Sequence, residues 1–328
     1  MATLITGGSG FIGLALCEHL LAEGKNVVIL DQGAPPAAFL RAIENLPGYL
    51  TIRVGSVLDP DALQEAFSSG IDGVFHGAAI TAGRERERTD AEWVITVNLV
   101  GTLRVLEAAR DHGIRRFVYP SSLSVYGESL HDREEAEEGA TPPFPESLYG
   151  VTKYAGERMV LRLGADSGHE VLCGRIGSVF GPWEVATGVR DLLSPFWYAA
   201  NRALSGGEIV VPRTPLKREL VYSRDVAAAI ARLLTCAEPR FRVYNISATF
   251  DWSRALERWC ETLALGLPGV TWREAAEGEI PNVLNHDERP RARQSVRRLV
   301  GDLGFTPRFG PLEAFSDYFE WLRAYGRD

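Results

Sequence analysis

Hydrophobic and polar residues follow two different patterns along most of this chain. Short apolar runs bounded by turn residues are typical of buried strands, and apolar positions that recur every three or four residues indicate helices. The strands predicted in this way span 1–6, 27–30, 50–54, 73–76, 117–120, 171–176 and 243–246. The predicted helices span 11–23, 61–68, 93–112, 149–163 and 225–234. Strands that alternate with helices pair in parallel through right-handed crossovers, so we expect an α/β fold built on a doubly wound parallel sheet.

The pattern loosens after residue 181, which indicates a second, smaller domain of mixed α/β structure toward the C-terminus. One later helix and one later strand can still return to the sheet. We therefore expect a sheet domain at 1–181 and about 219–248, and a discontinuous second domain at 182–218 and 249–328. The acidic and proline-rich stretch at 128–146 is expected to form a solvated surface loop.

Composition and charge exclude several classes of protein. With 328 residues, of which 45% are hydrophobic and 24% charged, the chain is typical of soluble globular proteins. The formal net charge of -8 argues against binding to nucleic acid or to an anionic membrane. Cys17, Cys173, Cys236 and Cys260 lack CxxC spacing, so we expect no metal and a reducing, cytoplasmic location. No apolar run is long enough to span a bilayer, and the N-terminus lacks the basic region of a signal peptide.

A glycine-rich turn follows the first predicted strand. Residues 6–13 read TGGSGFIG, which places Gly7, Gly10 and Gly13 between a strand and a helix. Glycines in this context permit a tight turn and a close approach of backbone to pyrophosphate, and the helix N-terminus supplies free N–H groups. The turn therefore predicts a dinucleotide site.

Two aspartates follow later strands of the predicted sheet. Asp31 ends the second strand, where a carboxylate accepts hydrogen bonds from ribose hydroxyls and repels a 2′-phosphate, which favours NAD over NADP. Asp59 follows the third strand and is a candidate for the adenine edge. It is equally a candidate N-cap for the helix that begins after Pro60.

Tyr149 and Lys153 are four residues apart in a predicted helix, so their side chains can point to the same place. The chain contains 35 Lys plus Arg, yet only Lys25, Lys153 and Lys217 are lysines. An ammonium beside a phenol favours the phenolate and lowers the pKa of the tyrosine, which makes the pair a candidate general base. The alternative is a helix in which a tyrosine and a lysine occur by accident.

Small and hydroxyl-bearing residues end two further strands. The segment 76–79 reads HGAA, and small side chains there would let a cofactor pass over the sheet edge. Ser121, Ser122 and Ser124 follow the fifth strand, at the edge where ligands bind in such sheets. A serine there can orient a substrate oxygen, or all three can be ordinary turn residues.

Together these motifs resemble those of the extended short-chain dehydrogenase/reductase family, and within it the NAD-dependent nucleotide-sugar epimerase and dehydratase group. The matching segments are TGGSGFIG at 6–13, Asp31, HGAA at 76–79, Asn98, SSLSVYG at 121–127, YGVTK at 149–153 and RIGSVFGP at 175–182. The weaker matches KRELVYSRDVAAA at 217–229 and LGFTP at 303–307 extend the resemblance to nearly the whole chain.

The resemblance implies an NAD-binding Rossmann domain, a substrate-binding C-terminal domain and a set of site residues. It implies that Tyr149 moves a proton to or from a carbinol, that Lys153 lowers its pKa and holds the nicotinamide ribose, and that Ser122 orients the substrate. The expected cofactor residues are Gly7, Gly10, Phe11, Ile12, Gly13, Asp31, Val57, Leu58, Asp59, Ala78, Ala79, Asn98, Tyr149 and Lys153. The expected substrate residues are Thr81, Arg84, Ser122, Ser124, Ser178 and Arg218.

The chain departs from the family pattern in its serine segment. The 4,6-dehydratases carry an acidic pair directly after the catalytic threonine, whereas Leu123 and Ser124 follow Ser122 here. Decarboxylating members carry a glutamate at the position of Ser124. Neither activity is therefore expected.

Other departures concern the substrate. Many nucleotide-sugar members carry asparagine at the position of Ser178, and a Gly-Asp-Gly loop where this chain has 211–217. RIGS at 175–178 is similar to uronate dehydrogenases, which oxidise a free sugar acid. These differences keep two kinds of substrate open, a nucleotide sugar and a free sugar acid.

The leading hypothesis is an NAD-dependent epimerase of a sugar or nucleotide sugar, similar to UDP-glucose 4-epimerase. The alternative is an NAD-dependent dehydrogenase of a free sugar acid or another small polyol. A third hypothesis is a dinucleotide sensor without catalysis. The complete set of Ser122, Tyr149 and Lys153 argues against it, because a sensor needs no proton donor.

Several arginines are candidates for an anionic substrate group. Arg84, Arg86 and Arg88 alternate with glutamates, so they either grip a substrate or form a self-neutralising exposed loop. Further candidates are Arg190, Arg213 and Arg218, while His286 and Arg289 have no assignable role. The helices predicted at 93–112 and 149–163 resemble the pair that forms the family's dimer interface, so a homodimer is expected.

Overall fold

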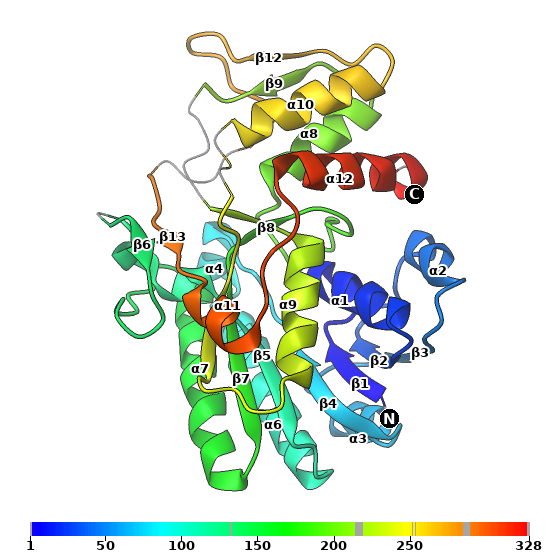
Figure 1. Ribbon diagram of the computed structural model, residues 1–328, viewed down its shortest axis with the longest axis vertical. Coiled ribbons are helices and arrows are strands. Elements are labelled where there is room, and N and C mark those ends of the chain that lie inside the picture. The colour runs from blue at the N-terminus through cyan, green and yellow to red at the C-terminus, as the bar shows by residue number, and fades with distance from the viewer. Residues whose placement is uncertain are drawn as a thin grey trace.

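A seven-stranded parallel sheet forms the centre of the computed structural model of this chain (Figure 1). The strands follow the order β11-β7-β5-β4-β1-β2-β3, and each neighbouring pair is parallel. They are β1 (Ala2–Thr6), β2 (Asn26–Asp31), β3 (Leu50–Val54), β4 (Ile71–His76), β5 (Arg116–Ser122), β7 (Glu170–Ile176) and β11 (Val243–Ile246). The structure describes residues 2–131, 133–213, 219–250, 252, 254–284 and 289–326, without the side chain of Ser167.

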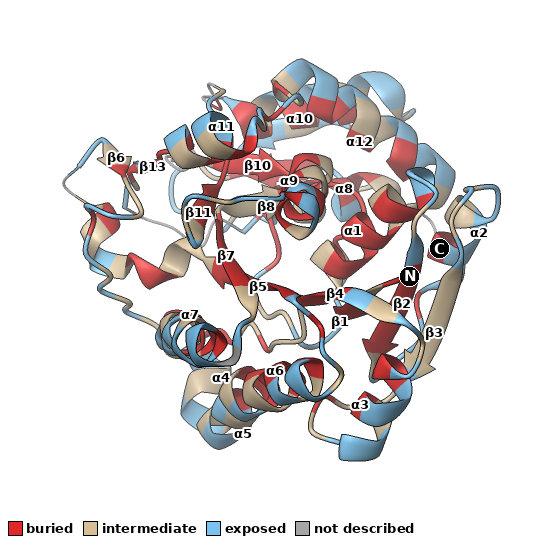
Figure 2. Ribbon diagram, turned by 60° about the horizontal axis from the view of Figure 1, so that its bottom comes forward, coloured by how far each residue is buried: buried red, intermediate tan, exposed pale blue. Residues whose placement is uncertain are grey.

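Helices cover both faces of this sheet (Figure 2). One face carries α1 (Phe11–Ala22), α9 (Ser223–Thr235) and α11 (Arg297–Leu303), and the other carries α3 (Pro60–Phe67), α6 (Thr102–Asp111) and α7 (Leu148–Ser167). Strands buried on two faces have continuous apolar runs because neither side of the strand meets water. The predicted doubly wound Rossmann fold is confirmed.

The prediction of one helix at 93–112 is wrong in one respect, because the observed helix is not continuous. It consists of α5 (Ala91–Ile95), a π-helical turn at Thr96–Gly101 and α6. The turn contains Asn98, which is 2% exposed and whose amide binds both backbone groups of Ile80. π-Helical turns occur mostly as single widenings of α-helices, often near functional sites. The short helices α2 (Ala37–Ile43) and α4 (Arg84–Thr89) were not predicted.

A second group of elements lies above the sheet in Figure 1. It contains α8 (Pro195–Leu204), α10 (Ala255–Gly266), α12 (Pro311–Tyr325), and the strand pair β9 (Ile209–Val211) and β12 (Trp272–Glu274). Two further pairs are β8 (Ser178–Phe180) with β10 (Leu220–Tyr222), and β6 (Glu135–Ala136) with β13 (Arg293–Gln294). The stretch predicted as a loop at 128–146 contains β6 and part of the 3-10 turn Gly127–Leu130. The division into two domains stays a prediction.

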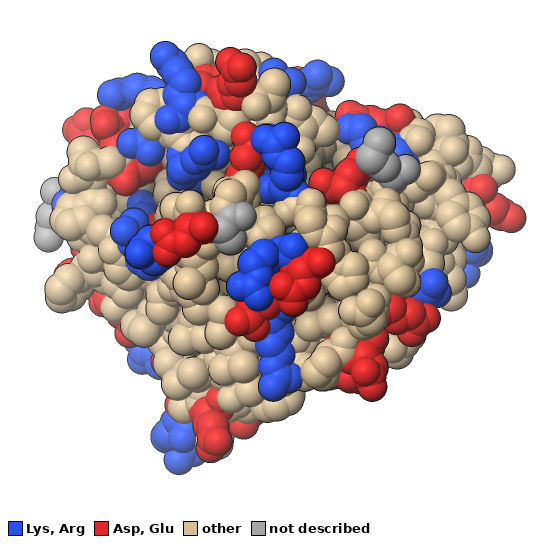
Figure 3. Space-filling view, turned by 90° about the horizontal axis from the view of Figure 1, so that it is seen from below, with Lys and Arg blue, Asp and Glu red and all other residues tan. Residues whose placement is uncertain are grey.

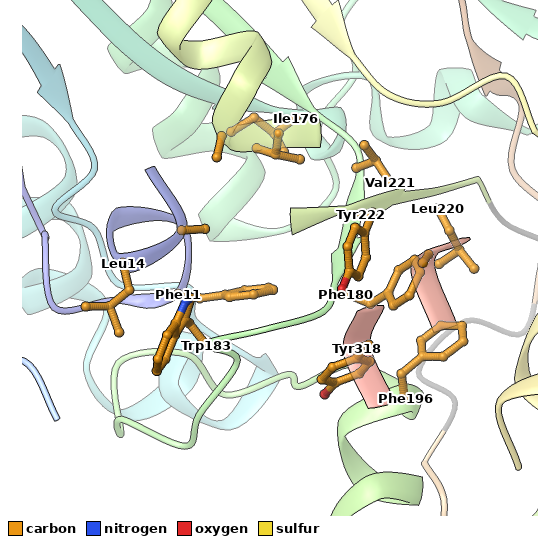
Figure 4. Packing of buried hydrophobic residues seen from close by; sticks show 14 of the residues in the cluster. Phe11, Leu14, Ile176, Phe180, Trp183, Phe196, Leu220, Val221, Tyr222 and Tyr318 are labelled. Atoms are coloured by element: carbon orange, nitrogen blue, oxygen red, sulfur yellow. The ribbon is translucent and has the colours of Figure 1, made fainter. Parts of the chain in front are cut away.

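One hydrophobic cluster joins the α1 and α9 face of the sheet to this second group. Aromatic rings form its centre, where the Phe180 and Phe196 ring centroids lie 4.4 Å apart and those of Phe180 and Tyr222 lie 5.4 Å apart (Figure 4). Trp259 and Tyr318 stack with centroids 4.6 Å apart. Because aromatic side chains bury large apolar areas, this cluster fixes the second group relative to the sheet.

The surface mixes charges of both signs. Acidic and basic side chains lie beside one another on the face seen from below the sheet (Figure 3). Among the described residues, no helix has the length and apolar character needed to cross a bilayer. The predicted homodimer stays a prediction, with α6 and α7 side by side on one face of the sheet.

Candidate active site

A cavity of about 320 Å³ lies between the carboxyl ends of the strands and the loop that joins β8 to α8. Ligands of open parallel sheets bind at this edge, where the strand order reverses, here between β1 and β4. The predicted residues that line the cavity are Gly7, Gly10, Phe11, Ile12, Gly13, Ala79, Thr81, Ser122, Tyr149, Lys153 and Ser178. The structure therefore brings the glycine turn, the serine segment and the Tyr–Lys pair to one place.

The glycine turn has a backbone that other residues would not permit. Gly7 has φ of +66°, and a Cβ added there would lie 2.6 Å from the amide nitrogen of Ala78. A Cβ on Gly13 would lie 2.3 Å from the carbonyl oxygen of Gly7. Gly10 is the N-cap of α1, and no side chain caps the described helix start. The first N–H groups of α1 are thus available to an anionic group, and the turn fits a dinucleotide pyrophosphate.

Asp31 is fixed at the end of β2 by backbone donors. Its carboxylate accepts hydrogen bonds from the backbone N–H groups of Ser9 at 2.9 Å and Gln32 at 2.7 Å. Burial raises the pKa of Asp31, although these hydrogen bonds oppose the shift. The hydrogen bond from Ser9 places the Asp31 carboxylate beside the glycine turn, which is where a partner of the adenosine ribose is expected. Asp31 does not line the cavity itself.

Asp59 takes the second of its two predicted roles. Its side chain accepts a hydrogen bond from the backbone N–H of Asp61 at 3.0 Å and caps α3, with Pro60 at the first helical position. Val57 is buried, and Leu58 accepts a hydrogen bond at its carbonyl from Arg104. None of Val57, Leu58 and Asp59 lines the cavity, and their predicted contact with the cofactor stays a prediction.

Tyr149 and Lys153 lie on the face of α7 that packs against β5. Ser147 caps this helix by accepting a hydrogen bond from the backbone N–H of Gly150 at 3.1 Å. Lys153 is 4% exposed, and its Nζ donates to the carbonyl of Pro120 at 2.8 Å. The same nitrogen lies 5.8 Å from the ring centroid of Tyr149, so the predicted proximity is present.

The pKa of Tyr149 differs from the prediction. Burial raises it above its ordinary value, and the opposing effects come from hydrogen bonds with Ser122 and Thr81 and from the charge of Arg190. Lys153 is not among these opposing groups; burial lowers its own pKa to about 8, and its ammonium donates to the carbonyl of Pro120. In the protein alone, Tyr149 is therefore a neutral phenol.

Ser122 and Ser124 form a small hydroxyl cluster next to Tyr149. The Ser122 hydroxyl accepts hydrogen bonds from the Ser124 backbone N–H at 3.2 Å and the Ser124 hydroxyl at 2.9 Å. Ser124 contacts Ser122 and does not line the cavity. This arrangement leaves the Ser122 hydroxyl oriented by its neighbour.

Two predicted arginines do not line the cavity. Arg84 is exposed at the start of α4, and Arg213 is exposed as well. Arg218 and His286 lie outside the described residues. Ala78 packs against Gly7 beneath the turn.

Asn98, an expected cofactor residue, and Arg289, which has no assigned role, both have partners within the protein. The contact of Asn98 with the cofactor stays a prediction. The amide of Asn98 joins Ile80 to Thr152 of α7, with its Nδ2 3.0 Å from the Thr152 hydroxyl. Arg289 forms ion pairs with Glu128 and Glu146. Asn98 thus supports the start of α7 from the π-helical turn.

The loop between β8 and α8 forms the second wall of the cavity. Trp183 at its start has φ of 70°, in the left-handed region that non-glycine residues rarely adopt. Further along, Arg190 pairs with Thr81 in an isolated parallel bridge. Asp191 binds Arg86 of α4 through both carboxylate oxygens, at 2.8 and 3.0 Å. The charged helix α4 therefore anchors the loop. This role of Arg86 is neither of the two that were predicted, which were binding a substrate and forming a self-neutralising exposed loop.

Arg190 presents a cation at the cavity. Its guanidinium carbon lies 5.1 Å from the ring centroid of Phe11, and its Nη2 lies 3.1 Å from a carboxylate oxygen of Glu184. The Glu184 side chain is fully buried and also accepts a hydrogen bond from the backbone N–H of Ser194 at 2.8 Å. The sequence identified Arg190 only as one of several candidates for binding an anionic group, because no local sequence pattern indicates its pairing with Thr81.

Glu219 lies next to Leu220, which lines the cavity. Its carboxylate accepts a hydrogen bond from the backbone N–H of Gln294. Burial raises the pKa of Glu219 to about 8, and the nearby Ser247 side chain and the hydrogen bond from Gln294 oppose the shift only in part. The carboxyl group is thus mostly protonated near neutral pH.

Comparison with known protein families gives a match over most of the chain. The sequence model of the NAD dependent epimerase/dehydratase family matches residues 3–247. A Bacillus subtilis (strain 168) protein named uncharacterized UDP-glucose epimerase YtcB is 34% identical over 186 residues. That match spans 56% of this chain and 58% of the length of YtcB.

Solved structures match over the whole length. The Thermus thermophilus UDP-glucose 4-epimerase in complex with NAD has a TM-score of 0.76 and 28% identity, with 98% of this chain and 99% of that chain covered. MoeE5 in complex with UDP-glucuronic acid and NAD has a TM-score of 0.75, 29% identity and the same coverage.

The glycine turn generates a prediction about NAD. We expect Gly13→Ala to weaken NAD binding by at least about tenfold, because its Cβ would push Gly7 out of the turn that faces the pyrophosphate. Calorimetric titration of the purified variant with NAD measures the effect. Gly301→Ala is the matched control, since a Cβ there meets nothing within 4 Å. Equal NAD affinity in both variants would contradict the assignment of the turn.

Glu219 generates a prediction about pH. Its pKa in the folded protein lies above the ordinary value of 4.5, so its contribution to stability is complete below that value and is lost as pH rises toward about 8. Glu219→Gln mimics the protonated carboxyl and should remove this loss. We expect the free energy of unfolding, measured with urea from about pH 5 to 8, to fall more steeply with pH in the natural protein than in the variant.

The control for this comparison is Glu277→Gln, which changes an exposed carboxylate. It should follow the pH profile of the natural protein. Parallel profiles for the natural protein and Glu219→Gln would show that Glu219 does not titrate in this range.

Proposed function

This chain belongs to the NAD-dependent epimerase/dehydratase family, and from this premise we propose that it epimerises a secondary alcohol of a nucleotide-linked sugar. The observation that carries the proposal is the half-buried phenol of Tyr149 at the cavity, where the Ser122 and Thr81 side chains lie close enough to oppose the rise in its pKa. A phenol that meets two hydroxyl side chains is suited to exchange a proton with a third, that of the sugar.

The residues that would hold NAD are those of the glycine turn and Asp31. The turn offers the N-terminus of α1 to the pyrophosphate, and Asp31 offers a carboxylate to the adenosine ribose. NAD supplies a nicotinamide ring that accepts and returns a hydride. The protein's own contribution is to position the sugar and move its proton.

Tyr149 takes the proton role in this proposal. Its raised pKa makes the phenol a proton donor in the reductive direction. In the oxidative direction it would act as the phenolate, having first released its own proton to solvent, and would then accept the proton that the sugar hydroxyl loses. Ser122, held by Ser124, would orient that hydroxyl. Lys153 would support the site from beneath, since its ammonium binds the carbonyl of Pro120 at the end of β5.

Epimerisation rather than dehydration is favoured by the side chains next to Ser122. A dehydratase must remove a proton from carbon and protonate a leaving hydroxyl, which requires an additional acid or base at the site. Leu123 and Ser124 supply neither. The solved structures named above as an epimerase and as a complex with UDP-glucuronic acid support a nucleotide sugar as the substrate.

Arg190 favours an acidic sugar. It lines the cavity, and its charge is close enough to Tyr149 to oppose in part the rise that burial causes in the pKa of the phenol. A guanidinium near the reacting hydroxyl matches a carboxylate on the same sugar ring. An acidic sugar also fits the second candidate, a dehydrogenase of a free sugar acid, which Ser178 in the cavity supports.

A substrate panel tests the proposed reaction. We expect the purified protein with NAD to convert UDP-glucose or UDP-glucuronic acid to its epimer without net NADH, followed by NMR of the sugar and absorbance of NADH. Tyr149→Phe should lower the rate by roughly 10²- to 10⁴-fold, because the proton donor is lost. Stoichiometric NADH from free glucuronic acid would establish the dehydrogenase instead. An unchanged rate in Tyr149→Phe would overturn the role of the phenol.

The charge of Arg190 generates a separate prediction. Arg190→Met should raise KM for an acidic sugar by about tenfold or more and leave KM for the neutral analogue within about twofold, because only the carboxylate loses a charged partner. Initial rates with UDP-glucuronic acid and UDP-glucose measure both. Arg84→Met is the control, since Arg84 is exposed and does not line the cavity. Equal changes in KM for both sugars would argue against recognition of a carboxylate by Arg190.

A further inference from the structure

A buried carboxylate lies two helical turns beyond Tyr149 on α7. Glu157 follows Lys153 by four residues, so Tyr149, Lys153 and Glu157 share one face of the helix. Glu157 is 1% exposed. A carboxylate buried this deeply needs partners, and its partners show what it holds in place.

Three hydrogen bonds reach Glu157 from two strands of the sheet. The Ser121 hydroxyl of β5 donates at 2.7 Å, and Arg175 of β7 donates through Nε at 3.0 Å and Nη2 at 2.7 Å. Ser121 and Arg175 are direct partners in the parallel pairing of β5 with β7. One carboxylate on α7 therefore joins the helix to both strands at a single position along the sheet.

This position is adjacent in the structure to the elements that hold the hydroxyls of Ser122 and Tyr149. Ser122 is the next residue after Ser121, and Tyr149 lies on the same helix face as Glu157. The distance between the Ser122 and Tyr149 hydroxyls is set by how α7 lies against the end of β5. The Glu157 bonds add to those of Lys153, which binds the same strand through the Pro120 carbonyl and lies 5.0 Å from the ring centroid of Tyr119, and they alone reach both strands through side chains.

Arg175 extends the connection to the turn that follows Ser122. Its guanidinium carbon lies 4.7 Å from the ring centroid of Tyr126, and the Tyr126 hydroxyl donates to the side chain of Asn245 at 2.8 Å. The 3-10 turn Leu123–Val125, which contains Ser124, lies between Ser122 and Tyr126. The serine segment is thus held at both ends, by Ser121 on Glu157 and by Tyr126 on Arg175.

We propose that Glu157 is a positioning residue of the reaction, which acts through Arg175 and Ser121 to hold the Ser122 hydroxyl at the phenol of Tyr149. The proposal rests on the proposed function, in that Ser122 and Tyr149 act together on a sugar hydroxyl. It does not depend on which sugar is turned over.

The energetics of buried ion pairs make this role testable. A buried pair adds little net stability compared with apolar residues of the same shape, because both ions lose their hydration. A bidentate ion pair fixes the relative orientation of its two side chains. Reacting groups that move by about 1 Å lose up to roughly a hundredfold in rate, so a positioning pair has its effect on kcat.

The same two strands contain a matched control pair at their opposite end. Arg116 and Glu170 are also register partners of β5 and β7, and their ion pair is 2.9 Å long. Arg116 also binds backbone carbonyls of Leu233 and Cys236 at the end of α9. This pair joins the same strands to a helix, but far from the cavity.

The first experiment compares Glu157→Gln with Glu170→Gln. We expect Glu157→Gln to lower kcat by about tenfold to a hundredfold while KM and NAD affinity change less than about threefold. Glu170→Gln should keep kcat within about twofold, even if its midpoint of thermal unfolding falls equally. Full kcat in Glu157→Gln, or equal loss in both variants, would overturn the proposal.

A second pair of variants covers the possibility that Glu157→Gln does not fold. Arg175→Lys keeps a cation beside the buried carboxylate but removes the bidentate guanidinium and its contact with the Tyr126 ring. Arg116→Lys is the control. We expect the loss of kcat in Arg175→Lys alone. Equal kcat in the two lysine variants would overturn the proposal.

A readout without a substrate separates this proposal from the proposed function. The chain has three lysines, Lys25, Lys153 and Lys217, so isotope-labelled lysine gives few NMR signals to assign. A shifted α7 should move the signal and titration midpoint of Lys153 in Glu157→Gln and not in Glu170→Gln. A natural protein that turns over no sugar would refute the proposed function, while an unmoved Lys153 signal would refute the role of Glu157.

Discussion

Two charged side chains of α7 are buried against the sheet, and each binds a different part of β5. Lys153 binds the carbonyl of Pro120, and Glu157 binds the hydroxyl of Ser121 together with Arg175 of β7. Charges removed from water persist only where the protein replaces their hydration with well-directed partners. These two contacts therefore permit one placement of α7, and the distance between Tyr149 and the serine segment follows from it.

The cavity has two walls of different character. The sheet side consists of backbone at strand ends and the glycine turn. The turn is closely packed, because a Cβ on Gly7 or Gly13 would collide with neighbouring backbone, and hydrogen bonds such as that from Gly7 N–H to Leu30 hold it in place. The other side is the loop before α8, anchored by Arg86 on Asp191 and by Glu184 on Ser194. In the proposed function, recognition of NAD falls to the wall on the sheet side. Selection of the sugar would fall to the loop, whose anchors are individual polar contacts.

The sequence predicted the wall on the sheet side well and the loop wall poorly, for a physical reason. Apolar runs and glycines encode strands and turns locally, so β1, the turn after it, and the helical spacing of Tyr149 and Lys153 could be predicted. The helix at 93–112 was predicted without its π-helical turn, because the contacts made there, between the Asn98 amide and both Ile80 and Thr152, are tertiary and leave no local pattern. The pairing of Arg190 with Thr81 spans a large separation in sequence and has no local pattern.

The direction of the Tyr149 pKa illustrates the same limit and gives the loop a part in the chemistry. Spacing suggested that Lys153 would stabilise the phenolate, but burial acts on both groups and favours the neutral form of each, which raises the pKa of Tyr149 and lowers that of Lys153. The cation that opposes burial at Tyr149 is Arg190, and the loop holds it there through Glu184. The proton affinity of the phenol therefore depends on where the loop lies. An acidic substrate group bound to Arg190 would add to the pairing of that cation with Glu184 and would favour the neutral phenol of Tyr149, which is the form that donates a proton in a reductive step.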